Sequence, residues 1–97
     1  MNIYISGSIT QNPKYLEQFT DAEIDLKVKY PNSKIFNPAR IAMNLPKLTH
    51  EQYMKLSFAE MSLCEAVYFL KGWESSIGAN QEYGYAVARG MKIIYQE

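Results

Sequence analysis

The chain has 97 residues, of which 47% are apolar and 13% aromatic, so residues 1–97 are expected to form one folded domain and disorder is excluded. Ten Lys and Arg residues balance ten Asp and Glu residues, so no net positive charge favours polymeric nucleic acid or an anionic membrane. The single cysteine, Cys64, excludes an internal disulfide, and the single histidine, His50, argues against a His-based metal centre.

The chain begins with β-branched and aromatic residues rather than with a signal peptide. Residues 2–6 predict a buried strand that ends at a Gly-Ser turn. Asn12 and Pro13 are typical of an N-cap and a first helical residue, and Pro31 ends the amphipathic helix that follows. No segment reaches the ~18 apolar residues of a membrane helix, so we expect a cytoplasmic protein. The apolar positions of this helix recur at spacings of three and four, at Leu16, Phe19, Ala22 or Glu23, Leu26 and Tyr30.

The middle of the chain continues the alternation of strand and helix. Residues 34–36 predict a short strand, and residues 38–48 predict one irregular helical turn. Thr49 and Gln52 have the spacing of a capping box, which predicts a helix from there to about Leu63. Because the domain is small, we expect self-association as a homodimer or larger assembly, with this helix as the candidate interface.

The last third of the chain contains the clearest strand. Residues 66–70 are apolar at every position, which is typical of a central parallel strand. A loop over residues 71–77 precedes a helix over residues 78–89 with Gly90 at its C′ position, and residues 91–95 predict the last strand. The residues of this helix that are expected to face the core are Tyr83, Ala86 and Val87.

Strands that alternate with helices predict an α/β fold, here a small Rossmann-like or flavodoxin-like three-layer sandwich. The sheet is expected to be mostly parallel and to have four to five strands. Ligands of such sheets bind outside the carboxyl ends of the strands. Two loops, residues 6–12 and residues 71–77, lie at those ends, and we expect any chemistry there.

The first loop, residues 6–12, combines a glycine with hydroxyl side chains. Gly7 lets backbone N–H groups approach an anion, and Ser6, Ser8 and Thr10 add hydroxyl donors close to the N-terminus of the following helix. The pattern is consistent with a phosphate cradle. An ordinary turn between a strand and a helix also favours small polar residues, so the loop alone does not separate the two interpretations.

The second loop leads through Ser76 and Gly78 to a helix start, where a polar ligand can bind. Glu82, in the first or second turn of that helix, is either a carboxylate favoured by the helix dipole or the nucleophile or base of a site. Trp73 either stacks on a base or covers the edge of the sheet. Tyr4 is either a core tyrosine or one whose hydroxyl reaches the same pocket.

Four short segments occur in order along the chain, namely residues 4–9 (YISGSI), 64–68 (CEAVY), 76–78 (SIG) and 82–86 (EYGYA). Together they resemble the nucleoside 2-deoxyribosyltransferase superfamily over nearly the whole chain. The chain is most similar to the short branch common in phage genomes and, among members of known chemistry, to the 2′-deoxynucleoside 5′-phosphate N-hydrolases. The resemblance implies a small-molecule nucleoside or nucleotide as ligand, a homo-oligomer and, for a phage protein, the host cytoplasm.

The resemblance also implies roles for individual residues. Glu82 corresponds to the nucleophile, and Tyr4 lies beside it and the sugar. Gly7 and Ser8 lie near the 5′ end of the substrate. Ser76, six residues before Glu82, corresponds to a serine that contacts the 5′-phosphate. No metal or organic cofactor is needed.

Two departures from the family pattern concern the base. Glu65 stands where the family has an aspartate that assists proton transfer to the base, so its carboxylate is one methylene further from the backbone. Characterised members also continue beyond the strand over residues 91–95 with a segment that helps to complete a neighbouring subunit's site. Base recognition is then simplified, lost or supplied by Trp73.

Two functions are compatible with these residues. The first is an N-glycosidase that acts on (deoxy)nucleoside 5′-monophosphates or nucleosides and cleaves the C1′–N bond, or transfers the sugar, through Glu82. We favour hydrolysis because Ser76 and the loop with Gly7 and Ser8 suit a phosphate. The alternative is a catalytically silent nucleotide-binding protein of the same fold.

Overall fold

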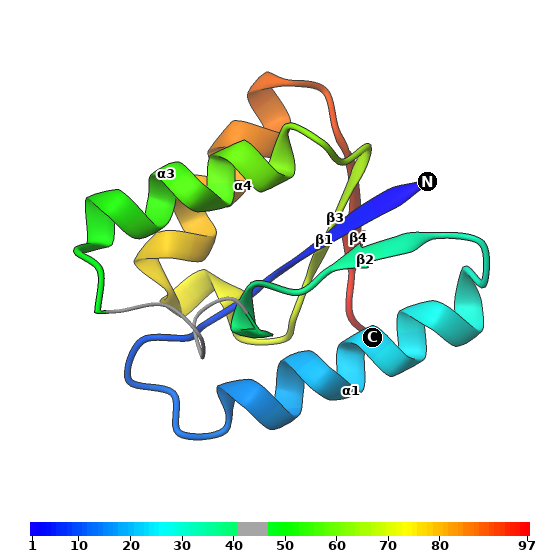
Figure 1. Ribbon diagram of the computed structural model, residues 1–97, viewed down its shortest axis with the longest axis horizontal. Coiled ribbons are helices and arrows are strands. Elements are labelled where there is room, and N and C mark those ends of the chain that lie inside the picture. The colour runs from blue at the N-terminus through cyan, green and yellow to red at the C-terminus, as the bar shows by residue number, and fades with distance from the viewer. Residues whose placement is uncertain (41–46) are drawn as a thin grey trace.

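Four parallel strands form a single sheet in the computed structural model, which describes residues 1–40 and 47–97 (Figure 1). The strand order is β2-β1-β3-β4, so β1 and β3 are the inner pair. Their register runs from Ile3 opposite Ala66 to Ser6 opposite Phe69. The strands are β1 (Asn2–Ser6), β2 (Lys34–Phe36), β3 (Ala66–Phe69) and β4 (Lys92–Tyr95).

One face of the sheet is covered by α1 (Tyr15–Lys29) (Figure 1). Phe19 and Leu26 of this helix are buried in one core cluster with Ile3 and Ile5 of β1. Complete burial of side chains of this size contributes about 1.5–3 kcal/mol each, so the cluster holds α1 firmly on the sheet.

The other face is covered by α3 (His50–Met61) and α4 (Ile77–Ala88), which lie side by side (Figure 1). Successive side chains of a strand point to opposite faces, so Tyr4 points away from α1 and packs with Met61 and Ala86. The expected α/β fold is thereby confirmed as a Rossmann- or flavodoxin-like arrangement, and the four strands of the described residues are all parallel.

The start of α1 differs from the expectation. The helix begins at Tyr15, whereas Asn12 and Pro13 belong to a preceding turn. Asn12 still acts as a local cap, because its Oδ1 accepts the N–H of Lys14 at 3.1 Å and its carbonyl accepts the N–H of Tyr15 at 3.2 Å. The predicted N-cap chemistry therefore stabilises a turn in front of the helix, and Leu16 of the expected apolar face is exposed.

The capping predictions for the later helices are confirmed. Thr49 and Gln52 form a complete capping box at the start of α3. Gly90 adopts a φ of +68° after α4, and the carbonyls of Val87 and Ala86 accept the N–H groups of Gly90 and Met91. This pair of hydrogen bonds is the Schellman arrangement, in which a glycine satisfies the last carbonyls of a helix.

Three smaller expectations are corrected or limited by the structure. The loop over residues 71–77 contains a short 3-10 helix, η1 (Trp73–Ser75). Val87 was expected to face the core, but it is 54% exposed because the buried face of α4 runs through Ala79, Glu82 and Ala86. Within the turn expected over residues 38–48, residues 38–40 are helical and residues 41–46 lie outside the described residues.

The helices also bear on the expectations of no membrane span and of self-association. In the parts of the chain that the structure describes, no helix is long and apolar enough to cross a membrane. Leu56 of α3 and Leu63 just beyond it are exposed. Self-association through this helix stays a prediction.

Two glycines of the same region provide a matched test of this backbone geometry. Replacing Gly90 with Ala is expected to destabilise the protein by about 1 kcal/mol, because a Cβ is strained at positive φ. Replacing Gly84, which lies within α4 with open space around its Cα, is expected to stabilise it by about 0.5–1 kcal/mol. Urea unfolding of both variants measures the two changes in the free energy of unfolding. If both substitutions stabilise the protein, or both destabilise it, the backbone geometry assigned to the two glycines is wrong.

Candidate functional site

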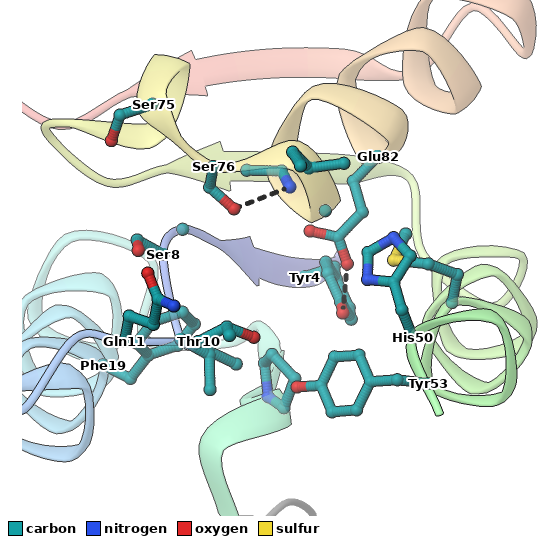
Figure 2. A pocket seen from close by; sticks show the side chains of 17 residues that line it. Tyr4, Ser8, Thr10, Gln11, Phe19, His50, Tyr53, Ser75, Ser76 and Glu82 are labelled. Carbon is teal, nitrogen blue, oxygen red and sulfur yellow. Dashed lines mark hydrogen bonds between the residues drawn. The ribbon is translucent and has the colours of Figure 1, made fainter. Parts of the chain in front are cut away.

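A pocket of about 290 Å³ opens at the carboxyl ends of β1 and β3, where the sheet topology predicts a ligand site (Figure 2). Its volume lies at the lower end of the range for small-molecule sites. The walls come from the loop after β1, the first turns of α3 and the segment that leads from η1 into α4. The residues that line it are Tyr4, Gly7, Ser8, Ile9, Thr10, Gln11, Phe19, Pro38, His50, Tyr53, Met54, Ser75, Ser76, Ile77, Gly78, Ala79 and Glu82.

Glu82 provides the carboxylate of this pocket. It lies on the buried face of α4 and is 5% exposed. The Tyr4 hydroxyl donates to Oε2 at 2.7 Å, and the Ser6 hydroxyl donates to Oε1 at 2.6 Å (Figure 2 shows Tyr4 and Glu82). Both donors come from β1 and stand two residues apart, so strand alternation directs them to the same face. The carboxylate is thus held in a fixed orientation at the inner end of the pocket.

Burial is the main cause of the pKa shifts of Glu82 and Tyr4. Burial raises the pKa of Glu82 above its ordinary value, while the hydroxyls of Ser6, Tyr4 and Ser57 partly offset this effect because they favour the ionised form. Burial and the charge of Glu82 raise the pKa of Tyr4 well above its ordinary value. The Tyr4 hydroxyl therefore stays protonated and remains a donor.

A second carboxylate lies near this site on α3. Burial, together with the charge of Glu82, raises the pKa of Glu60 to about 7. The negative charge of Glu82 thus favours the protonated form of Glu60. Glu60 does not line the pocket, and Glu82 acts on it through charge.

The loop after β1 approaches the end of β3 very closely. A Cβ at Gly7 would lie 3.0–3.2 Å from three side-chain atoms of Leu70, which is closer than such atoms normally approach. The Leu70 N–H also donates to the Ser6 carbonyl at 2.9 Å. Any larger residue at position 7 therefore requires Leu70 to shift, and Ser8, the next residue, lines the pocket.

The N-terminus of α4 forms the opposite wall. Ser76 is its N-cap, and the Ser76 hydroxyl oxygen accepts the N–H of Ala79 at 3.1 Å (Figure 2). A serine hydroxyl that accepts one hydrogen bond still has its own proton to donate. Gly78 follows in the first turn, where N–H groups lack intrahelical partners and the helix dipole favours an anion. The structure thus places Ser8, Ser76 and Gly78 around one cavity.

Two of the predicted site residues lie elsewhere. Glu65 is exposed, precedes β3 and accepts the N–H of Asn2 at 3.2 Å, so it lies at the amino ends of the strands, opposite the pocket. Trp73 packs in an aromatic cluster, with ring centroids 5.0 Å from Tyr83 and 4.8 Å from Phe69. Neither residue lines the pocket.

The structure adds residues that the sequence reasoning did not assign to the site. Ser6 was expected only as a hydroxyl donor of the first loop, whereas it is the last residue of β1 and donates to Glu82; its spacing of two residues from Tyr4 could have predicted this. Ser57 and Tyr53 stand one helical turn apart on α3, and their approach to Glu82 depends on how α3 packs on α4. His50 is exposed and lines the pocket, and its Nε2 lies 2.8 Å from the Gln81 Oε1.

Comparison with known proteins gives a family without an assigned activity. Residues 1–95 match the family model described as a domain of unknown function (DUF4406). The chain belongs to the DUF4406 family. No curated protein and no solved structure matches the chain. Within residues 1–40 and 47–97 of this DUF4406 domain, no group of three His, Cys, Asp or Glu side chains is placed to hold a metal ion.

Replacing Glu82 with Gln is expected to raise the melting temperature at neutral pH. Because folding raises the pKa of Glu82, the ionised side chain disfavours the folded state, and stability is lost as pH rises through that pKa. Gln does not ionise and keeps a hydrogen-bonding oxygen. Thermal unfolding between pH 4 and pH 8 tests this. The increase in melting temperature of Glu82→Gln over the wild type should become smaller toward pH 4.

The matched control is Glu74→Gln, because Glu74 is an exposed residue of η1. Exposed substitutions of this kind change stability by only about 0.5 kcal/mol or less. A Glu82→Gln variant that is less stable than the wild type at neutral pH would show that the carboxylate stabilises the fold.

Proposed function

We propose that this protein is an N-glycosidase that cleaves the C1′–N bond of (deoxy)nucleoside 5′-monophosphates or nucleosides, with Glu82 as the nucleophile. The observation that carries the proposal is a buried carboxylate held by two hydroxyl donors, Tyr4 and Ser6, at the inner end of a pocket. The resemblance of the sequence segments around Tyr4 and Glu82 to nucleoside 2-deoxyribosyltransferases supports the same roles.

The proposed reaction proceeds in two steps. An oxygen of Glu82 attacks C1′ and forms a glycosyl ester, while the electron pair of the C1′–N bond leaves with the base. Water then attacks C1′, and the Glu82 carboxylate is released. Overall, one water molecule is consumed, with its hydroxyl on C1′ and its remaining proton on the base. Transfer to a second base replaces the water in a transferase.

The hydrogen bonds to Glu82 fit this chemistry. The carboxylate has about four lone-pair sites and interacts with three hydroxyls, those of Tyr4, Ser6 and Ser57, so a lone pair remains for attack on C1′. Tyr4 and Ser6 also hold the carboxylate against rotation, which matters because a displacement of about 1 Å can reduce a rate on the order of 100-fold. Tyr4 and Ser6 thus act as positioning residues for the nucleophile.

The other side of the pocket suits a 5′-phosphate. Ser8 and Ser76 present hydroxyls there, and the first turn of α4 provides N–H groups and the positive end of the helix dipole. Net charge does not oppose this, because the chain is neutral overall. A nucleoside 5′-monophosphate can then reach Glu82 with C1′ while its phosphate lies at the helix start.

The position of Glu65 favours a second candidate, a nucleotide-binding protein without turnover. Among the described residues, Glu82 is the only carboxylate that lines the pocket, and Glu65 lies at the opposite edge of the sheet. A departing base gains typically 10²–10⁴-fold from a positioned general acid. Without one, the pocket can retain nucleotide and release base slowly or not at all.

The assay that separates these functions follows free base by chromatography over a panel of deoxyribonucleoside 5′-monophosphates and nucleosides. Wild type is expected to release base, and Glu82→Ala to lose the activity by on the order of 10⁴-fold or more. Tyr4→Phe should retain the ring and lose about 10–100-fold, because one hydrogen bond to a charged group is removed.

Glu65→Gln is the matched control and is expected to keep its activity, because it lies away from the pocket. Nucleotide binding by calorimetry without base release would establish the second candidate. Equal base release by wild type and Glu82→Ala would exclude the nucleophile assigned here.

The pH dependence of the reaction gives an independent test of Glu82. A nucleophilic carboxylate must be ionised, so kcat/KM is expected to fall about tenfold per pH unit below the raised pKa of Glu82. Glu60→Gln is the control, and its acid limb is expected to stay at the same pH, because burial and the hydroxyls of Ser6, Tyr4 and Ser57 set the pKa of Glu82. An acid limb that disappears or moves in Glu60→Gln would assign it to Glu60, whose own pKa is about 7.

A further inference from the structure

The Tyr53 hydroxyl is a buried polar group without a hydrogen bond. Within the described ranges, it is the one buried side-chain oxygen or nitrogen that has no partner. Buried hydroxyls are nearly always paired, because an unpaired one loses its water without compensation. The Tyr53 side chain also lines the pocket, so a small displacement of its ring on binding brings the hydroxyl, which has almost no exposed area in the free protein, into contact with a bound molecule that supplies the missing partner.

The position of this hydroxyl is defined by three elements. Tyr53 projects from α3, and its hydroxyl points toward the interior of the pocket, on the side where Tyr4 and Thr10 lie (Figure 2). Burial, the charges of Glu82 and Glu60 and the nearby Tyr15 of α1 all raise the pKa of Tyr53. The Tyr53 hydroxyl therefore stays protonated.

The pocket that Tyr53 lines also has apolar side chains. Phe19 of α1 and Pro38, which follows β2, line the same pocket. The Asn37 side-chain N–H donates to the Phe19 carbonyl at 3.3 Å, so the segment after β2 is fixed against α1. By contrast, Ser76 at the start of α4 belongs to the polar wall that suits a phosphate.

We infer that Tyr53 is a specificity-determining residue, which contacts the base of the substrate through its hydroxyl. This inference rests on the proposed function. A nucleobase is a flat ring with polar atoms at its edge, so its faces can pack on the apolar side chains of the pocket while its edge pairs with the Tyr53 hydroxyl. With the phosphate at Ser76 and C1′ at Glu82, the base occupies the side of the pocket formed by Phe19, Pro38 and Tyr53.

The consequence is selection among bases. A hydroxyl can donate one hydrogen bond and accept others, so Tyr53 can pair with a carbonyl oxygen, a ring nitrogen or an amino group. A base that presents no such atom at this position leaves the buried hydroxyl unpaired and binds more weakly. Tyr53 thus distinguishes ligands by the edge of the base, whereas Glu82 acts on the bond that all substrates share.

Calorimetry on the Glu82→Ala background tests the inference without turnover. The variant Tyr53→Phe removes only the hydroxyl. Its Kd is expected to rise about tenfold for the deoxynucleoside 5′-monophosphate that binds best, and to stay unchanged for 2-deoxyribose 5-phosphate, which has no base. The melting temperature of Tyr53→Phe without ligand is expected to stay the same or rise, because no hydrogen bond of the free protein is lost.

Each other outcome overturns the inference. An equal loss of affinity for 2-deoxyribose 5-phosphate would place the hydroxyl on the sugar or phosphate, and an unchanged Kd for every nucleotide would leave it without a role in binding. A lowered melting temperature of Tyr53→Phe without ligand would show that the hydroxyl stabilises the fold. Tyr85→Phe is the matched control, since Tyr85 stacks on Phe58 and does not line the pocket. If nucleotide binds but the wild type releases no base, the proposed reaction is wrong and the inference about Tyr53 is unaffected.

Discussion

The site depends on one buried negative charge that is stabilised by hydroxyl groups. Glu82 is surrounded by donors from β1 and α3, and among the described residues it forms no ion pair. A buried ion pair would stabilise the charge more strongly, but it would also lower the reactivity of the carboxylate and occupy its lone pairs. Hydroxyls orient the group and leave it basic. By contrast, buried Glu23 is paired with Lys27 and Arg40 and serves the fold.

The parallel sheet determines which residues can reach this charge. β1 and β3 are the inner strands, and both end at the pocket, so the loops that follow them meet over Glu82. Strand alternation turns Tyr4 and Ser6 toward α4, while Ile3 and Ile5 of the same strand pack under α1. One five-residue strand thereby supplies both the core of one face and the donors of the site.

Much of this arrangement could be predicted from the sequence, because strand periodicity and capping are local. The apolar run over residues 66–70 and the capping box at Thr49 each follow from a few neighbouring residues. The positions of Tyr53 and Ser57 could not be predicted in this way, since they depend on the packing of α3 against α4. Trp73 was ambiguous for the same reason, because its partner Tyr83 comes from α4. Glu65 was predictable in principle, because a residue before a parallel strand lies at the edge away from the ligand.

The contact between Gly7 and Leu70 limits the order in which this pocket can change during evolution. Any side chain at position 7 meets the Leu70 side chain, so it is accommodated more easily after residue 70 has lost volume. A smaller residue at 70 leaves a gap while Gly7 is still present. The two loops that line the pocket are therefore expected to vary as a pair, with the β3 side changing first. A lineage that keeps Leu70 keeps the same backbone path beside Ser8, whatever happens to the outer residues of the loop.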